Sequence, residues 1–215
     1  MIDAVVFDLD GLLIETEEIW DEVREALVRE RGGRWTDSAQ RDMMGMSSTE
    51  WARYLHEMLG LREAPAELNR LVVRRMAERY REHLPLLPGA VEAVQRLAAH
   101  WPLAVASSSN RPLIDLVLEL SGLAPLFQAT VSSEEVARGK PAPDVYLEAA
   151  RRLGVEPRGA AAVEDSQAGI GAARAAGMRV VAIPNRSFRP SEEAVASADV
   201  VLNSLDELTP AAVAG

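Results

Sequence analysis

Two aspartates, separated by one residue, follow a short apolar stretch near the start of the chain. The sequence Ala-Val-Val-Phe-Asp-Leu-Asp-Gly occupies positions 4–11, and its first four residues favour a buried strand. Because side chains on a strand repeat every two residues, Asp8 and Asp10 can point the same way where the strand ends. Two carboxylates in such a place repel each other, so they need a cation, a shared proton or a cationic neighbour.

The rest of the chain must supply the elements that bring other groups to this point. Residues from about 15 to about 84 have the apolar spacing of amphipathic helices, and from about residue 86 strands and helices alternate. Such alternation predicts right-handed crossovers and a parallel sheet covered on both faces. The sequence therefore predicts an α/β fold, a doubly wound, Rossmann-like, mostly parallel sheet built from residues 1–14 and 85–215. A helical module, residues 15–84, is inserted directly after the first strand.

Further polar residues follow the other predicted strands. Ser107 comes after an apolar run at 103–106, Glu164 and Asp165 follow a run at 160–163, and Lys140 precedes a helix that begins near Pro143. Ligands of open α/β sheets bind at the carboxyl ends of the strands. Taken singly, each residue is explained as a helix cap, a turn residue or a surface lysine. Their common place at one edge of the sheet favours chemistry instead.

This set of four carboxylates, one hydroxyl and one lysine has a chemical logic. Hard oxygen ligands without histidine or cysteine suit Mg²⁺. A carboxylate beside Mg²⁺ can attack phosphorus, and a second carboxyl can protonate the leaving oxygen and later deprotonate water. A lysine and a hydroxyl can orient and neutralise the transferred phosphoryl group.

Bulk properties exclude several other classes of protein. The chain has 215 residues and a net charge of −10, and it has no basic cluster, which argues against a nucleic-acid-binding face. The absence of cysteine excludes disulfides and thiolate zinc sites. No segment is apolar for long enough to span a membrane, and no signal peptide is apparent. We therefore expect a cytoplasmic protein, and nothing in the sequence demands more than a monomer.

Four short motifs resemble those of the haloacid dehalogenase superfamily, in the same order. They are Phe-Asp-Leu-Asp-Gly at 7–11, Ser107 after its strand, Gly-Lys-Pro-Ala-Pro-Asp-Val-Tyr at 139–146, and Val-Glu-Asp-Ser at 163–166 followed by Gly169. The helical module resembles the four-helix cap of the β-phosphoglucomutase-like and sugar-phosphatase branch. The dehalogenases of the superfamily lack the second aspartate, so Asp10 indicates phosphoryl transfer.

The resemblance implies a role for each motif residue. Asp8 would be the nucleophile and a Mg²⁺ ligand, and Asp10 the general acid and base, with its main-chain carbonyl on the metal. Ser107 and Lys140 would hold the phosphoryl group. Asp165 would bind Mg²⁺, and Glu164 would bind it directly or through water. Gly11 would let the chain turn from the strand into the cap.

Residues near the first motif and on the cap should contact the leaving group, because a closing cap excludes water and forms the pocket that binds the leaving group. The candidates are Glu15, Trp20, Met44, Met46, Ser47 and Ser48 from the cap, with Gly11, Ser108, Asn110 and Arg111 from the core. The alternative for Trp20, Trp51 and the methionines is that they form the core of the cap itself.

Three hypotheses follow. The first is a Mg²⁺-dependent phosphatase that acts on a small phosphorylated metabolite, a sugar or polyol phosphate, through an aspartyl-phosphate. The second is a β-phosphoglucomutase-like mutase. It is disfavoured because mutases have a histidine at the position of Trp20, and because an arginine grips the distal phosphate where this chain has Ser48. The third is a binding or regulatory module that keeps the fold without turnover.

Overall fold

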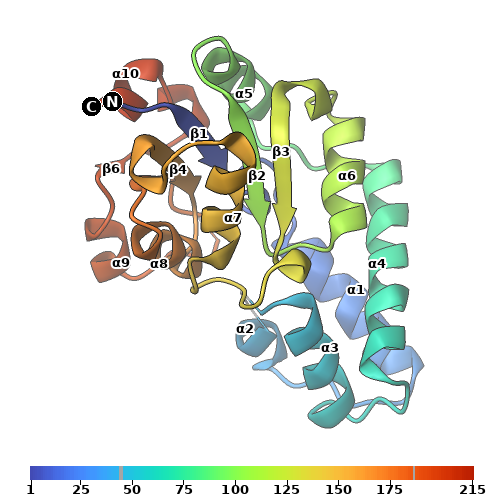
Figure 1. Cartoon of the computed structure of the whole chain (residues 1–215). Coiled ribbons are helices and arrows are strands. Elements are labelled where there is room, and N and C mark those ends of the chain that lie inside the picture. The colour runs from blue at the N-terminus through green and yellow to red at the C-terminus, as the bar shows by residue number, and fades with distance from the viewer. Residues whose placement is uncertain (44–45, 186) are drawn as a thin grey trace.

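One six-stranded sheet forms the centre of the molecule. The computed structural model describes residues 1–43, 46–185 and 187–215. The strand order is β3-β2-β1-β4-β5-β6, and each neighbouring pair is parallel (Figure 1). The predicted doubly wound α/β fold is therefore confirmed. The strands are β1 (Ala4–Phe7), β2 (Leu103–Ser107), β3 (Phe127–Ser132), β4 (Ala160–Glu164), β5 (Arg179–Ala182) and β6 (Val200–Val201).

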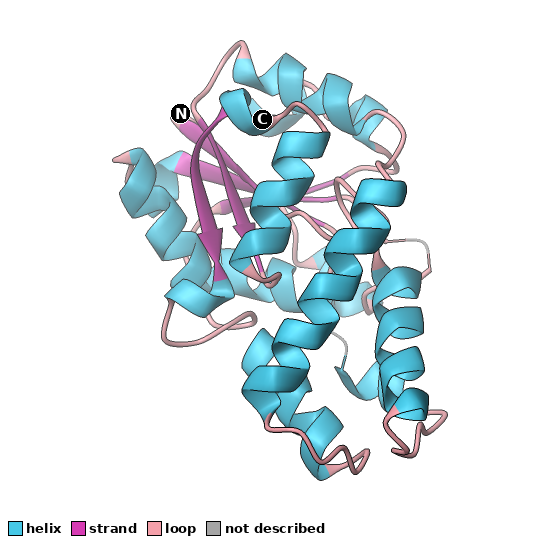
Figure 2. Cartoon of the chain, turned by 90° about the vertical axis from the view of Figure 1, so that its right-hand side faces the viewer, coloured by secondary structure: helices cyan, strands magenta, loops and turns pink. Residues whose placement is uncertain are grey.

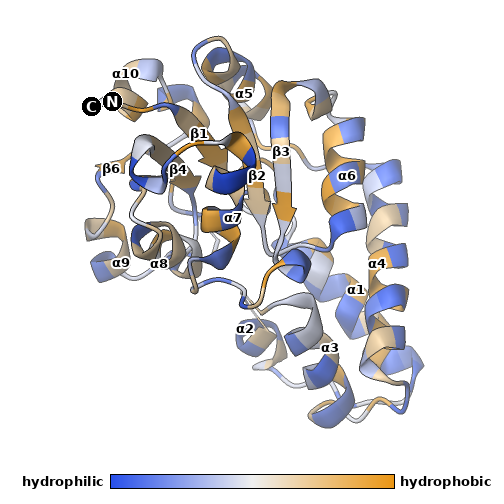
Figure 3. Cartoon of the chain, in the orientation of Figure 1, coloured by the Kyte–Doolittle hydropathy of each residue, from blue (hydrophilic) through white to orange (hydrophobic). Residues whose placement is uncertain are grey.

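Both faces of the sheet are buried under helices. Along β1, Val5 and Phe7 pack into one apolar cluster, whereas Val6 packs into the other, as the two-residue repeat of a strand requires. The first cluster is closed by α5 (Ala90–Ala98) and α6 (Arg111–Leu120), and the second by α7 (Asp144–Leu153) and α8 (Gln167–Ala175). Hydrophilic and hydrophobic residues share each of these helices (Figure 3), which is typical of helices that cover a core.

Four helices lie between β1 and α5 in the described part of the chain. They are α1 (Glu17–Glu30), α2 (Ala39–Met43), α3 (Ser48–Glu57) and α4 (Pro65–Glu82). Ser47 and Glu50 form a capping box at the start of α3, and Pro65 begins α4. The long helix α4 packs against α1, α3 and α6. In Figures 1 and 2 this helical segment extends beyond one end of the sheet, and the chain termini lie at the other end.

Two segments connect the sheet to the helical segment, and their backbones are hydrogen-bonded to each other. The Glu15 amide donates to the Pro85 carbonyl at 2.8 Å, and the Leu87 amide donates to the Leu13 carbonyl at 2.9 Å. These bonds support the proposed division into a core of residues 1–14 and 85–215 and a cap of residues 15–84.

Several short elements were not predicted. They are α2, α9 (Glu192–Ala196) and α10 (Pro210–Ala214). Nowhere in the described residues does a helix combine the length and the apolar character needed to cross a membrane.

Candidate active site

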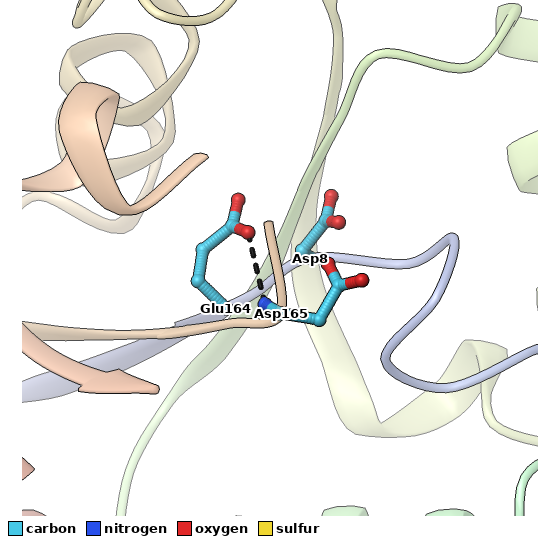
Figure 4. A group of neighbouring side chains, drawn as sticks. All are labelled: Asp8, Glu164 and Asp165. Carbon is cyan, nitrogen blue, oxygen red and sulfur yellow. Dashed lines mark hydrogen bonds between the residues drawn. The ribbon is translucent and has the colours of Figure 1, made fainter. Parts of the chain in front are cut away.

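Three carboxylates meet at the centre of the sheet edge. The strand order reverses between β1 and β4, and the carboxyl ends of strands at such a point form a ligand crevice. The Asp8 amide donates to the Val163 carbonyl at 3.0 Å, so Asp8 lies level with the end of β4. One oxygen from each of Asp8, Glu164 and Asp165 lies within 4.8 Å of the other two. Figure 4 shows these three side chains gathered at the ends of the two strands.

Lys140 lies among these carboxylates. Its ammonium donates to Asp8 Oδ1 at 2.7 Å and to Glu164 Oε1 at 2.6 Å, and all three side chains are buried. A buried ammonium bonded in this way offsets much of the cost of desolvating its partners. The structure thus brings Lys140, from the loop before α7, together with Asp8, which follows β1, and Glu164, which ends β4.

The carboxylates outnumber the cation, and their titration reflects this. Burial raises the pKa of Asp8 to about 7, against the opposing effect of Lys140. Burial also raises the pKa of Asp165 well above its ordinary value, with further contributions from Glu164 and Asp8. Although burial lowers the pKa of Lys140, the two carboxylates bonded to it raise that pKa above its usual value. One ammonium among three carboxylates leaves a site that favours an additional cation.

The Asp10 carboxylate accepts hydrogen bonds from four side chains. The Thr16 hydroxyl and the Trp20 indole donate to Oδ1 at 2.8 and 3.5 Å, and the Ser107 and Ser109 hydroxyls donate to Oδ2 at 3.2 and 2.7 Å. Thr16 and Trp20 lie just before α1 and in its first turn, whereas Ser107 ends β2 and Ser109 follows it. Asp10 is therefore held between the core and the helical segment, where a proton donor to a leaving group would be needed.

Two glycines make room for the carboxylates. Gly11 has a φ of 80°, and a Cβ there would lie 2.1 Å from Asp165 Oδ2. A Cβ on Gly169 would lie 1.7 Å from Glu164 Oε1. Gly11 and Gly169 therefore each lie against a motif carboxylate, where a larger residue would clash with it.

A cavity of about 1020 Å³ opens from this edge toward the helical segment. Its inner end is lined by Asp8, Asp10, Lys140 and Asp165. Its walls include Glu17, Trp20, Arg24, Arg41, Met43, Met46 and Trp51 from the helical segment, and Ser108, Ser109, Asn110, Asn185 and Phe188 from the sheet side. The cavity is large enough for a phosphate with a sizeable leaving group attached.

Comparison with known proteins agrees with this geometry. Residues 5–183 match the family of haloacid dehalogenase-like hydrolases. The chain belongs to this family.

The similar proteins include one named as a phosphatase and one named as a putative mutase. Hexitol phosphatase B from Escherichia coli K12 is 34% identical over 226 residues, covering 96% of this chain and 94% of that protein. CbbY from Rhodobacter sphaeroides, solved in complex with phosphate, is 30% identical with a TM-score of 0.89, and the match covers both chains completely. A putative β-phosphoglucomutase from Thermotoga maritima has a TM-score of 0.74 at 27% identity, with 96% of each chain covered. The predicted resemblance is confirmed, and this member of the family is a phosphoric monoester hydrolase.

The predicted substrate residues of this haloacid dehalogenase-like hydrolase fall into two groups. Trp20, Met46, Ser108 and Asn110 line the cavity. Other candidates make contacts outside the described cavity wall: Ser48 donates to Glu134 at 2.9 Å, Ser47 caps α3, Arg111 donates to Glu135 and Thr130, and Glu15 lies at the crossing to Pro85. Gly11 packs on Asp165, and Met44 lies outside the described residues.

Five residues that sequence reasoning missed are part of the site or contact it. Thr16 and Ser109 bond to Asp10, and Tyr146 bonds to Glu164. Glu17 and Arg24 line the cavity beside Trp20. For Glu17 and Arg24 a sequence signal was available: their spacing from Trp20 places positions 17, 20 and 24 on one face of α1.

Glu17 gives a stability prediction with a defined pH dependence. Burial and the nearby Asp10 charge raise the pKa of Glu17 to about 7. The folded state therefore binds more protons than the unfolded state between about pH 4.5 and 7, and stability falls as pH rises through this range. The free energy of unfolding of Glu17→Gln should exceed that of the wild type by about 2 kcal/mol at pH 8.5. At pH 4 the two values should be equal, because Glu17 is then protonated in both the folded and the unfolded wild type.

Urea denaturation at both pH values measures this difference. Glu18→Gln serves as the matched control, because Glu18 is the exposed neighbour. An equal stability change for Glu17→Gln at pH 4 and pH 8.5 would contradict the assignment.

Proposed function

We propose that this hydrolase is a Mg²⁺-dependent phosphatase that acts on a small sugar or polyol phosphate through an aspartyl-phosphate on Asp8. The observation that carries the proposal is the arrangement at the inner end of the cavity. There Asp8, bonded to Lys140, and Asp10, held by four donors, face the same space. A nucleophile and a proton donor on one cavity wall are what phosphoryl transfer requires. We further expect a cytoplasmic monomer.

The carboxylate set fits a hard divalent cation. All of its oxygens are ligands that Mg²⁺ prefers, and Asp165 Oδ1 is buried without a hydrogen-bond partner among the described residues. Asp8, Asp165 and the main-chain carbonyl of Asp10 would hold the ion, with Glu164 bound directly or through water. A bound Mg²⁺ would neutralise charge on the phosphoryl oxygens.

The side chains then divide the reaction between them. The Asp8 carboxylate attacks phosphorus, an Asp8–phosphorus bond forms, and the bond from phosphorus to the ester oxygen breaks. Asp10 gives its proton to the departing oxygen. Water then attacks phosphorus, Asp10 takes the proton from that water, and phosphate leaves with Asp8 restored. Lys140 would hold the phosphoryl oxygens throughout, together with Ser107.

The walls of the cavity support a polyhydroxylated leaving group. The Arg24 guanidinium lies 4.6 Å from the Trp20 ring centroid and 5.0 Å from that of Trp51. Its Nε is buried and has no hydrogen-bond partner in the described part of the chain. Beside it, Glu17 offers a carboxyl group to the same cavity. A hydroxylated chain supplies both acceptors for Arg24 and donors for Glu17, while its C–H groups suit the apolar wall.

The mutase remains the second candidate because one of the solved relatives is a putative β-phosphoglucomutase. A mutase must hold two phosphates. Ser48, which stands where the mutases have their phosphate-gripping arginine, donates to Glu134 at the junction with the core. This contact favours the phosphatase.

A panel of phosphate esters tests the proposal. Hexose, pentose, hexitol and glycerol phosphates and nucleotides are offered with Mg²⁺, with EDTA, and with EDTA followed by excess Mg²⁺. We expect phosphate release from sugar or polyol phosphates that EDTA abolishes and Mg²⁺ restores. Isomerisation of a hexose 1-phosphate, primed by a bisphosphate and faster than phosphate release, would instead establish the mutase. Binding without turnover of any ester by well-folded protein would establish a binding module.

A further inference from the structure

The Glu164 carboxylate is saturated by donors of the protein itself. Oε1 accepts hydrogen bonds from Lys140 Nζ at 2.6 Å and from the Tyr146 hydroxyl at 2.6 Å. Oε2 accepts from the Asp165 amide at 3.0 Å, the Ser166 amide at 3.2 Å and the Ser166 hydroxyl at 3.1 Å. A carboxylate offers about four lone-pair sites. Five donors therefore leave no free site on Glu164 for a metal ion.

The surroundings hold Glu164 in this arrangement. The two amides belong to the turn that leads into α8, where negative charge is favoured. Gly169, on the first turns of α8, leaves room for the carboxylate. Asp8, Lys140 and Asp165 line the cavity, whereas Glu164 is fully buried and lies outside the described cavity wall.

Tyr146 contacts both members of the ion pair. Its hydroxyl bonds to Glu164, and its ring centroid lies 5.0 Å from Lys140 Nζ. The side chain is fully buried on α7, at the end nearer the loop that carries Lys140. A phenylalanine at position 146 would keep the packing of the ring and lose only the hydrogen bond of the hydroxyl group.

Lys140 is the only lysine in the chain, and the other 22 basic residues are arginines. Its ammonium bridges Asp8 on one side and Glu164 on the other. The position of the ammonium against the nucleophile therefore depends on where Glu164 is held.

We propose that Glu164 and Tyr146 are positioning residues, which together hold the Lys140 ammonium against Asp8. Glu164 is then not a direct metal ligand, and the ion would be held by Asp8, Asp165 and the main-chain carbonyl of Asp10. The catalytic consequence of this inference rests on the proposed function, whereas the arrangement of the ammonium and the metal ligands does not.

The first experiment follows the ammonium directly. Protein labelled with ¹⁵N-lysine gives one side-chain ammonium signal, because the chain has one lysine. We expect a slowly exchanging signal in the wild type and roughly tenfold faster exchange with water in Tyr146→Phe, since a hydrogen bond to a charged group is lost. The matched control is Tyr54→Phe, which removes a tyrosine bond of 2.8 Å to Asp42 on the helical segment. Equal exchange in Tyr146→Phe and Tyr54→Phe would overturn the positioning role.

The second experiment measures Mg²⁺ binding by calorimetry, without substrate. We expect Tyr146→Phe and Glu164→Gln to bind Mg²⁺ within about twofold of the wild type, and Asp165→Asn to bind at least about tenfold more weakly. A loss in Glu164→Gln as large as that in Asp165→Asn would return Glu164 to the ligand set.

The third readout is turnover of p-nitrophenyl phosphate. Tyr146→Phe should lower kcat about tenfold at saturating Mg²⁺, and Tyr54→Phe should leave kcat unchanged. An unchanged kcat in Tyr146→Phe would contradict the catalytic consequence. If the wild type releases no phosphate, the proposed function fails, and the ammonium signal still decides the positioning role.

Discussion

Asp8→Asn is expected to abolish turnover of p-nitrophenyl phosphate, with a loss of about 10³-fold or more, because an amide cannot act as the nucleophile. Asparagine has nearly the same shape as aspartate, and Lys140 can still donate to its oxygen. The fold should therefore persist, as circular dichroism and thermal melting would show. Phosphate release under saturating Mg²⁺ measures the effect.

The control for this variant lies at the other end of the same strand. Asp3→Asn changes an exposed aspartate that precedes β1 and should leave the rate unchanged. A rate for folded Asp8→Asn within tenfold of the wild type would exclude Asp8 as the nucleophile.

Lys140→Met should damage both stability and activity. Methionine keeps the length of the side chain but leaves the buried carboxylates of Asp8 and Glu164 without their cation. Removal of one partner from a buried ion pair costs about 3–5 kcal/mol. We expect a loss of this size in urea denaturation with EDTA at pH 7.5, and a drop in kcat/KM of about 10²-fold or more because the phosphoryl group loses its lysine.

Mg²⁺ should recover part of the lost stability, because a divalent ion supplies charge to the same carboxylates. Arg138→Ala is the matched control. Arg138 lies two residues before Lys140 in the chain, and its exposed guanidinium is paired with Asp144. Equal stability losses in Lys140→Met and Arg138→Ala would show that the buried ammonium has no special role.

Much of the fold could be predicted because its determinants are local. The apolar run before Asp8 and those at 103–106 and 160–163 specify buried strands, and alternation with helices specifies a parallel sheet. In a parallel sheet every strand presents its carboxyl end at the same edge. Residues that follow the strands therefore meet without any knowledge of packing, which is why Asp8, Glu164 and Asp165 could be grouped in advance.

The remaining contacts depend on how distant surfaces pack. Tyr146 contacts Glu164 because of the position at which α7 packs on the sheet, and no local sequence pattern specifies that position. Ser48 stands close to the cavity residues in sequence, but the orientation of α3 directs its hydroxyl to Glu134. Glu17 and Arg24 were readable in principle from their helical spacing with Trp20, but the side of α1 that faces the cavity is decided by tertiary contacts.

The central claim is that the phosphoryl group passes through Asp8, and trapping the intermediate tests it most directly. Wild-type enzyme turning over p-nitrophenyl phosphate with Mg²⁺ is quenched in acid and reduced with borohydride, which converts an aspartyl-phosphate into homoserine. Mass spectrometry of the digested chain then locates the change. We predict homoserine at position 8 and at no other aspartate, and none in Asp8→Asn. Homoserine at Asp10 or Asp165, or full turnover with no reducible intermediate, would contradict the mechanism.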